Sequence, residues 1–143
     1  MSDFSLQQTV RFQHCDPAGI VFYPRYFEMI NTTVEEWFAQ RLGAPFATLH
    51  GAMGAAVPTA SISIDFHAPS RLGEVLELRL RPTRIGRSSV GLSIEAHCGD
   101  EKRFSMESTL VFTRKGASGS AEWPEDIRAR ILQELGEPVK DDA

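Results

Sequence analysis

The sequence predicts an α+β fold in which one long helix packs against an antiparallel sheet of five strands. Two observations carry this prediction. Residues 24–42 place apolar side chains at steps of three and four, which is typical of an amphipathic helix. One segment before this helix and four after it alternate apolar and polar residues, which is typical of strands with one buried face. Because short turns separate the last four segments, the strands should be antiparallel, with the helix against one face of their sheet.

The first strand is expected at residues 4–13. Pro17, Ala18 and Gly19 then turn the chain, and Pro17 biases Asp16 away from helical geometry. Asp16 is therefore expected at the rim of the first strand. The apolar residues that alternate along this strand are Phe4, Leu6, Val10 and Phe12.

The long helix is expected to begin at Pro24, which suits a first helical turn because its missing N–H costs nothing there. Gly43 is the expected C-terminal cap after Leu42, and Pro45 prevents the helix from continuing. The apolar face consists of Tyr26, Phe27, Ile30, Val34, Trp37, Phe38 and Leu42.

Residues 43–56 are expected to form a loop with a short helical turn near 46–50. Four alternating runs follow, separated by turn residues. The tail predicts a short helix at 124–135 and a frayed end at 137–143. Residues 1–143 are expected to form one domain. The residues that share a face in each run are Ala60, Ile62, Ile64 and Phe66; Leu76, Leu78 and Leu80; Val90, Leu92, Ile94 and Ala96; and Phe104, Met106, Leu110 and Phe112.

The composition is that of an ordinary globular domain, with 143 residues of which 42% are hydrophobic and 24% charged. The net charge of −4 argues against a nucleic-acid partner. No signal peptide and no apolar stretch of membrane-spanning length is seen, so no membrane partner is expected. The two cysteines, Cys15 and Cys98, are expected to be thiols of a cytoplasmic protein.

A carboxylate and a helix N-terminus lie one short turn apart in this chain. The free N–H groups of a first helical turn favour negative charge or a polarised carbonyl oxygen. Asp16 is therefore a candidate nucleophile or general base, and the N–H groups near Phe22, Tyr23 and Arg25 are candidate oxyanion donors. These are the parts needed to attack an acyl group. The plainer interpretation is that Asp16 only caps the turn that follows it.

The run Asp16-Pro17-Ala18-Gly19-Ile20-Val21-Phe22-Tyr23-Pro24 resembles the signature of the 4-hydroxybenzoyl-CoA thioesterase family. The resemblance implies a hotdog fold, in which the sheet wraps around the long helix. It implies an acyl-CoA thioesterase whose catalytic carboxylate is Asp16 and whose oxyanion donor is the N–H of Tyr23. No cofactor is expected, since coenzyme A enters only within the substrate and product. Bare sheet edges, together with the resemblance, predict a homodimer or a homotetramer with sites at the subunit boundary.

A second candidate site is the hairpin expected at residues 84–89. Arginine binds phosphate oxygens through paired hydrogen bonds, glycine allows close approach, and coenzyme A carries phosphates. The resemblance implies a nucleotide-binding role for Arg87 and Ser88, and less closely for Arg84. The plainer interpretation is a solvated turn whose charges serve solubility.

Aromatic walls suit a flat aryl group, and Phe22, Tyr23 and Tyr26 are candidates to contact the acyl group. His67, at the end of its strand, is a further pocket candidate. The spacing of the four histidines matches no zinc pattern, so no metal site is expected. His14 would share a strand face with Asp16, and Cys15 is expected to be a buried thiol.

The leading hypothesis is hydrolysis of an acyl-CoA thioester, with an aryl group such as 4-hydroxybenzoyl slightly favoured over short aliphatic chains. A hydratase or dehydratase is disfavoured, because the sequence lacks an Asp-x-Asn-Pro-x-His pattern. Two further functions are compatible with the fold: a non-catalytic acyl-CoA-binding module and a thioesterase for acyl carrier protein. The intact Asp16 argues against the former, and the net charge of −4 gives the latter no support.

Overall fold

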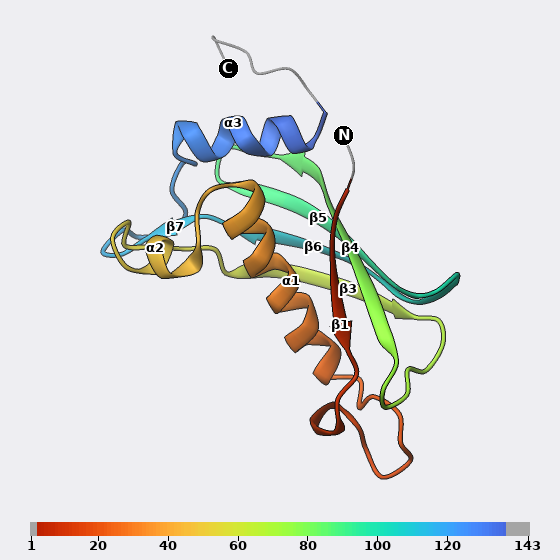
Figure 1. Ribbon diagram of the computed structural model, residues 1–143. Helices are drawn as coiled ribbons and strands as arrows, with labels where there is room; N and C mark the ends of the chain where they lie inside the picture. The colour runs from red at the N-terminus through yellow and green to blue at the C-terminus, as the bar shows by residue number, and fades with distance from the viewer. Residues whose placement is uncertain (1–2, 137–143) are drawn as a thin grey trace.

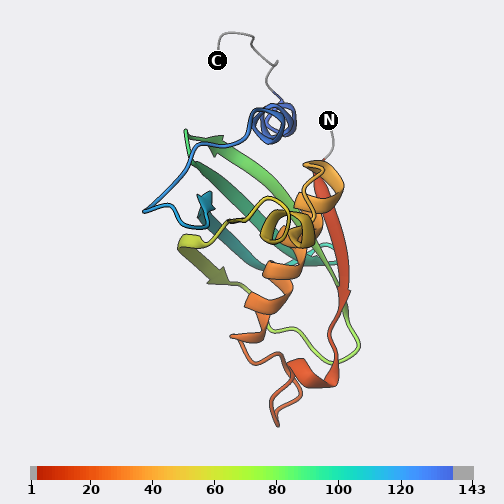
Figure 2. The same cartoon turned by 90° about the vertical axis from the view of Figure 1, so that its left-hand side faces the viewer.

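The computed structural model describes residues 3–136, and it confirms the predicted architecture of a long helix against a five-stranded antiparallel sheet (Figure 1). The helix α1 (Arg25–Arg41) lies across one face of the sheet, as the side view shows (Figure 2). The strand order is β1-β4-β5-β6-β3, so β1 and β3 form the two edges. The strands are β1 (Phe4–Thr9), β3 (Thr59–Phe66), β4 (Val75–Ile85), β5 (Ser89–Cys98) and β6 (Glu101–Val111).

The core forms where the apolar face of α1 meets the alternating residues of β4, β5 and β6. The predicted inward-facing residues of these three strands are all buried, as alternation along a strand requires. On α1 the buried face also includes Met29 and Thr33, which continue the same helical stripe. Trp37 and Phe38 are fully buried and meet edge to face at a ring separation of 5.4 Å.

The first strand is shorter than the predicted 4–13. β1 ends at Thr9 because its partner β4 begins at Val75, the residue that pairs with Thr9. The chain then forms a short 3-10 helix, η1 (Phe12–His14), which leaves Phe12 82% exposed. Asp16 therefore does not lie at the rim of a strand, and His14 and Asp16 do not share a strand face.

The edge strand β3 exposes the face that its sequence pattern marks as apolar. Ile62 is 42% exposed and Phe66 is 47% exposed, whereas the equivalent residues of its neighbour β6 are buried. Tyr23 and Tyr26 contact the Phe66 ring and Ile64 packs against the core, so this face is only partly covered within the described chain. The alternation therefore predicts the strand correctly, but Ile62 and Phe66 remain partly exposed in the single chain.

Short elements complete the fold. The predicted helical turn is present as α2 (Phe46–His50), and the helix α3 (Glu125–Glu134) lies within the range predicted for the tail. The predicted frayed end at 137–143 lies outside the described residues. A small second sheet, made by β2 (Ala55–Ala56) and β7 (Thr113–Arg114), was not predicted. None of the helices in residues 3–136 has the length and apolar character needed to cross a membrane.

Candidate active site

Asp16 lies in a tight loop that is closed by a β-bridge between Cys15 and Val21. The Asp16 N–H donates to the Ile20 carbonyl over 2.9 Å, which closes the loop from within. Gly19 has a φ of +80°, a conformation that residues with a Cβ resist. The loop is therefore held by its own backbone, and the half-buried Asp16 carboxylate is presented from a defined position.

One carboxylate oxygen of Asp16 does cap the turn. Its Oδ1 accepts a hydrogen bond of 2.9 Å from the Ala18 N–H. For Oδ2, no hydrogen-bond donor is found among the described residues. The turn-capping role and a chemical role are therefore compatible, because one oxygen holds the loop and the other is available.

The helix entrance leaves one of the three expected oxyanion donors available. The Phe22 N–H donates to the His14 carbonyl over 2.9 Å, and the Arg25 N–H donates to the Phe22 carbonyl over 2.8 Å. Pro24 has no N–H to donate. The Tyr23 N–H has no acceptor within the described residues, and it is the donor that the family resemblance indicated.

The predicted aromatic residues divide into an exposed and a buried set. Phe22 is 50% exposed and Tyr23 is 58% exposed, and their rings meet edge to face at 5.7 Å. Tyr26 is buried, stacks on Phe66 at 5.8 Å, and donates its hydroxyl to Ser70 Oγ over 2.9 Å. Burial raises the pKa of Tyr26 above its usual value. Phe22 and Tyr23 are thus accessible to a substrate in the single chain, whereas Tyr26 is part of the packed interior.

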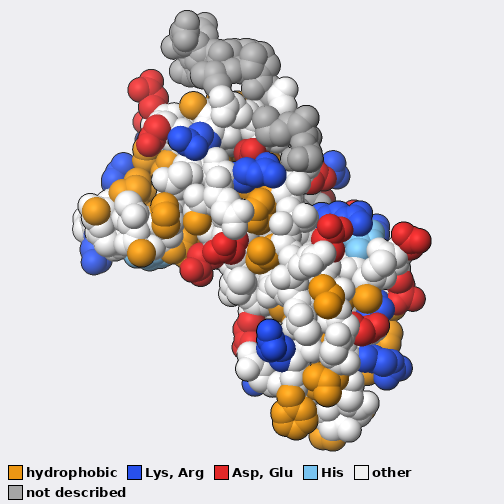
Figure 3. Space-filling view, in the orientation of Figure 1, with side chains coloured by type: hydrophobic (Ala, Val, Ile, Leu, Met, Phe, Trp, Pro, Cys, Tyr) orange, Lys and Arg blue, Asp and Glu red, His pale blue; other side chains and the backbone are white. Residues whose placement is uncertain are grey.

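A mostly apolar hollow of about 360 Å³ opens beside Asp16. Figure 3 shows hydrophobic side chains at the lower end of the molecule, where Figure 1 places this loop. Phe12 and Leu72 are the large side chains that line the hollow, and both are more than half exposed. Asp16 is the one charged residue in its lining, which is completed by Cys15, Pro17 and Gly19.

Neither His14 nor His67 makes a direct hydrogen bond to Asp16. His14 is buried, its Nδ1 accepts a hydrogen bond of 2.8 Å from the Arg11 N–H, and desolvation lowers its pKa. His67 is exposed and shares a hydrogen bond of 2.8 Å between its Nε2 and Ser105 Oγ. Cys15 is half-buried and thus less buried than expected, and its thiol donates to the Arg11 carbonyl over 3.6 Å.

The predicted phosphate-binding hairpin lies at the other end of the sheet (Figure 1). Val75 pairs with Thr9 at the Asp16 end of β4, and Ile85 ends the same strand ten residues later. Ten residues of extended chain span about 33 Å. Within one chain, the structure therefore does not bring the 84–88 hairpin to the Asp16 loop.

The hairpin residues differ in how their side chains are engaged. Arg84 donates from Nη2 to Thr109 Oγ1 over 2.6 Å, on the outer face of the sheet. Arg87 is exposed, and its backbone carbonyl accepts from the Trp123 N–H over 3.1 Å. Ser88 is half-buried, and its carbonyl accepts from the Phe112 N–H. Arg87 is thus the cation of this turn best presented to solvent.

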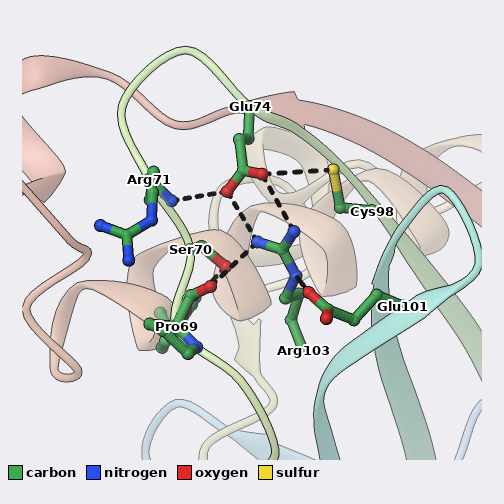
Figure 4. Close-up of polar contacts among 8 residues, drawn as sticks. Pro69, Ser70, Arg71, Glu74, Cys98, Glu101 and Arg103 are labelled. Atoms are coloured by element: carbon green, nitrogen blue, oxygen red, sulfur yellow. Dashed lines mark hydrogen bonds and ion pairs between the residues drawn. The ribbon is translucent and has the colours of Figure 1, made fainter.

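A partly buried ion pair near the Asp16 loop was not predicted (Figure 4). Arg103 is 6% exposed and donates from Nη1 and Nη2 to the two carboxylate oxygens of Glu74, over 2.7 and 3.0 Å. The sequence pattern does not single out Arg103, which lies near the start of β6. Its neighbour Phe104 faces the core, so simple alternation placed Arg103 in solvent.

A bulge in β6 explains why the alternation misled. Ala96 pairs with Phe104 and His97 pairs with Lys102, so Arg103 has no partner residue on β5. A bulged residue is unpaired and its side chain is re-aimed. Within residues 3–136, no group of histidine, cysteine and acidic side chains is arranged to hold a metal ion.

Comparison with known proteins places these features in a family context. Residues 18–105 match the family described as the thioesterase superfamily, a match that begins two residues after Asp16. A 1,4-dihydroxy-2-naphthoyl-CoA hydrolase from Synechococcus elongatus is 28% identical over 88 residues, which are 61% of this chain. The matched stretch spans only 64% of that relative's own length.

Solved structures share the fold over nearly the whole chain. A 1,4-dihydroxy-2-naphthoyl-CoA thioesterase from Synechocystis superposes with a TM-score of 0.83 at 20% identity, covering 94% of this chain and 98% of its own. A gentisyl-coenzyme A thioesterase superposes with a TM-score of 0.80 at 20% identity, covering 90% of this chain and 99% of its own. At such identities the likeness establishes the hotdog fold.

Proposed function

The chain belongs to the thioesterase superfamily, and on that premise we propose that it hydrolyses an acyl-CoA thioester to a free acid and coenzyme A. The observation that carries this proposal is the pairing of two available groups at one loop. The Tyr23 N–H has no acceptor among the described residues. Asp16 lies inside the loop that the bridge between Cys15 and Val21 closes, and Tyr23 follows directly after that loop.

The two groups would divide the chemistry between them. The Tyr23 N–H donates to the thioester oxygen as that oxygen gains negative charge, reinforced by the positive end of the α1 dipole. Asp16 either attacks the carbonyl carbon or removes a proton from an attacking water. In the first route a mixed anhydride forms, the thiolate of coenzyme A leaves, and water then cleaves the anhydride. In the second route the water oxygen bonds to the same carbon and the thiolate leaves.

An aryl acyl group with ring hydroxyls is the preferred substrate in this proposal. The hollow beside Asp16 is walled by Phe12 and Leu72, and the exposed Phe22 and Tyr23 lie at the helix entrance. Flat apolar surfaces of this kind suit an aromatic ring. The named substrates of the similar proteins, dihydroxynaphthoyl-CoA and gentisyl-CoA, belong to the same chemical class as the 4-hydroxybenzoyl group favoured from the sequence.

A complete site in this proposal requires a second copy of the chain. The β3 edge is unpaired within the described chain and carries the exposed Ile62 and Phe66, which a partner would cover. Antiparallel pairing of two β3 edges reverses one sheet relative to the other. The partner's 84–88 hairpin would then point toward the end that carries Asp16, where Arg87 could hold the nucleotide phosphates. A homodimer is therefore the smallest active unit, and a homotetramer is a pair of such dimers.

The test is release of free thiol from a panel of 1,4-dihydroxy-2-naphthoyl-CoA, gentisyl-CoA, 4-hydroxybenzoyl-CoA and butyryl-CoA. The aryl thioesters should give the highest kcat/KM. Asp16→Asn should lower kcat on the best substrate by about 10²–10⁴-fold and leave KM nearly unchanged. Asn retains an oxygen that can accept from the Ala18 N–H, so the turn should persist.

The matched control is Asp100→Asn, which removes a carboxylate from the exposed turn between β5 and β6 and should leave turnover unchanged. Near-normal turnover in a folded Asp16→Asn variant would reduce Asp16 to a turn cap and contradict the proposed mechanism. Absence of thiol release from every CoA thioester of the panel would contradict the proposed activity.

A further inference from the structure

The turn at residues 69–74, here called the bracing turn, is bonded to both sides of the Asp16 loop. On the incoming side, the Val10 N–H donates to the Glu74 carbonyl over 2.8 Å, and the Gly73 N–H donates to the Val10 carbonyl over 2.9 Å. On the outgoing side, the Val21 N–H donates to the Ser70 carbonyl over 2.9 Å. The two chain segments that flank Asp16 are therefore fixed to one short turn.

The same turn also reaches the first turn of α1. Ile20 forms a β-bridge with Arg71, and the Tyr26 hydroxyl donates to Ser70 Oγ. Tyr26 lies one helical turn from Tyr23, so the position of the helix entrance also depends on this contact. A shift of the bracing turn would therefore move both the carboxylate and the proposed oxyanion donor.

The bracing turn is in turn held by Glu74 and Arg103 (Figure 4). In addition to its two bonds to Glu74, the Arg103 guanidinium donates from Nη1 to the Pro69 carbonyl over 3.1 Å. The Glu74 carboxylate accepts from the Arg71 N–H over 2.7 Å. The Arg103 guanidinium and the Glu74 carboxylate thus fix the two ends of the turn, Pro69 and Glu74, and the Arg71 N–H between them.

The Arg103 side of this ion pair is shielded from solvent, whereas the Glu74 side chain is 30% exposed. The Arg103 side chain is 7% exposed, and its Nε lies 2.7 Å from Glu101 Oε1 without a well-aligned hydrogen bond. The guanidinium beside Glu74 lowers the pKa of that carboxyl to about 2, so both groups stay charged at neutral pH. Removing the Glu74 charge would leave the Arg103 guanidinium with only the more exposed Glu101 as a charged partner among the described residues.

We propose that Glu74 and Arg103 are positioning residues for thioester hydrolysis, which place Asp16 and the Tyr23 N–H relative to each other through the bracing turn. This inference rests on the proposed function. Neither residue acts on the substrate. Because a displacement of about an ångström can cost on the order of 10²-fold in rate, loosening the turn should reduce kcat more than substrate binding.

A second ion pair provides a matched control for a merely structural role. Glu134 accepts from Arg41 Nη1 over 3.0 and 3.2 Å and from Trp37 Nε1 over 3.0 Å, so it resembles Glu74 in its partners. It joins α1 to α3 at the opposite end of the helix from Tyr23. Loss of either pair should lower the melting temperature, but only loss of the Glu74 pair should affect the Asp16 loop.

The experiment compares Glu74→Gln with Glu134→Gln on the best CoA thioester of the panel. Glu74→Gln should lower kcat by about 10-fold or more with KM within about twofold, whereas Glu134→Gln should keep kcat within about twofold. If Glu74 acts through Asp16, then Glu74→Gln should change the residual turnover of Asp16→Asn by less than about threefold. If Glu74→Gln does not fold, Arg103→Lys, which keeps the charge but not the fork, should show the same pattern at about threefold or more.

The outcomes separate this inference from the proposed function. Equal losses of kcat in the Glu74 and Glu134 variants, or an undiminished Glu74 effect in the Asp16→Asn background, would overturn the positioning role. Loss of activity in Asp16→Asn together with full kcat in the folded Glu74→Gln or Arg103→Lys variant would also overturn it and leave the proposed function intact. Full turnover in Asp16→Asn would instead contradict the proposed mechanism and, with it, this inference.

Discussion

The two ends of the main sheet are built in different ways. At the Asp16 end, the loop is closed by its own backbone and fixed to the bracing turn, and a partly buried ion pair holds that turn. At the other end, the 84–88 hairpin is anchored through its backbone, through the bond from Arg84 to Thr109 and through the bond from Arg128 to the Gly86 carbonyl, and the Arg87 side chain is exposed. The first arrangement suits chemistry, in which position decides the rate, and the second suits binding of a charged group that needs an accessible cation.

In the proposed function, the distance between the two ends requires a second chain. A substrate that has its acyl group beside Asp16 and its phosphates beside Arg87 would have to span about 33 Å along the sheet of a single chain. In the proposed dimer, a second, reversed sheet at the unpaired β3 edge would bring its own hairpin to the Asp16 end. The proposed pairing at β3 would therefore bring the two different ends together in one site.

The strongest test of this view is to disrupt the β3 edge with Ile62→Glu. A charge at this exposed apolar position would be desolvated at the dimer interface and would remove the apolar contact with the second copy. The protein should therefore become a monomer. If both ends are needed in one site, kcat/KM for a CoA thioester should fall by about 10²-fold, as expected from the loss of two or more charge-assisted contacts. Light scattering at micromolar concentration and thiol release measure the two effects.

The control for this variant is Ser5→Glu, which places a charge on the exposed face of the opposite edge strand, β1. It should leave assembly and activity unchanged. Dissociation by Ser5→Glu alone would show that β1 is the paired edge. A wild-type monomer with full activity would contradict the shared site.

A smaller effect is expected from Arg87→Ala, which separates binding from chemistry. If Arg87 holds a phosphate of coenzyme A, KM should rise by about 10-fold and kcat should stay nearly constant, because that contact is equal in ground and transition states. The matching pantetheine thioester, which lacks the nucleotide, should show no change. Arg79→Ala, on the middle of β4, is the control and should alter neither parameter. An equal loss on both substrates would assign Arg87 a structural role.

The parts of the molecule that the sequence predicted are those determined by local pattern. The period of α1 and the alternation of β4, β5 and β6 follow from which residues face one core. The Asp16 turn was predictable for the same reason, since Pro17 and Gly19 set its backbone within a few residues. Of the three candidate oxyanion donors, the N–H groups of Phe22 and Arg25 are engaged, by the His14 carbonyl and the Phe22 carbonyl respectively.

The parts that the sequence missed depend on distant partners. The end of β1 is set by where β4 begins, and the exposure of the apolar face of β3 reflects a surface that one chain does not cover. The ion pair of Glu74 and Arg103 was missed because a bulge reverses the expected direction of one side chain. Glu74 closes a Gly-containing turn and Arg103 lies near the start of another strand, and nothing local in the sequence joins the two.

The smallest expected effect concerns the acid stability of the Asp16 end. The pKa of Glu74 is lowered from 4.5 to about 2 by Arg103, so the folded state favours the ionised carboxylate. A group with a lowered pKa contributes its stability above its unfolded value, and that contribution is lost as the pH falls from about 4.5 to about 2. The Glu74 side chain is 30% exposed, so solvent screening limits its contribution to on the order of 2 kcal/mol.

The difference in unfolding free energy between the wild type and Glu74→Gln should therefore be about that size at pH 6 and should shrink toward pH 3. Urea titrations at fixed protein concentration measure this difference, because the other carboxylates titrate alike in both proteins and cancel. A difference that stays constant from pH 6 to pH 3 would mean that the ionised carboxylate does not stabilise the bracing turn, and the contrast between the two ends would then rest on backbone hydrogen bonds alone.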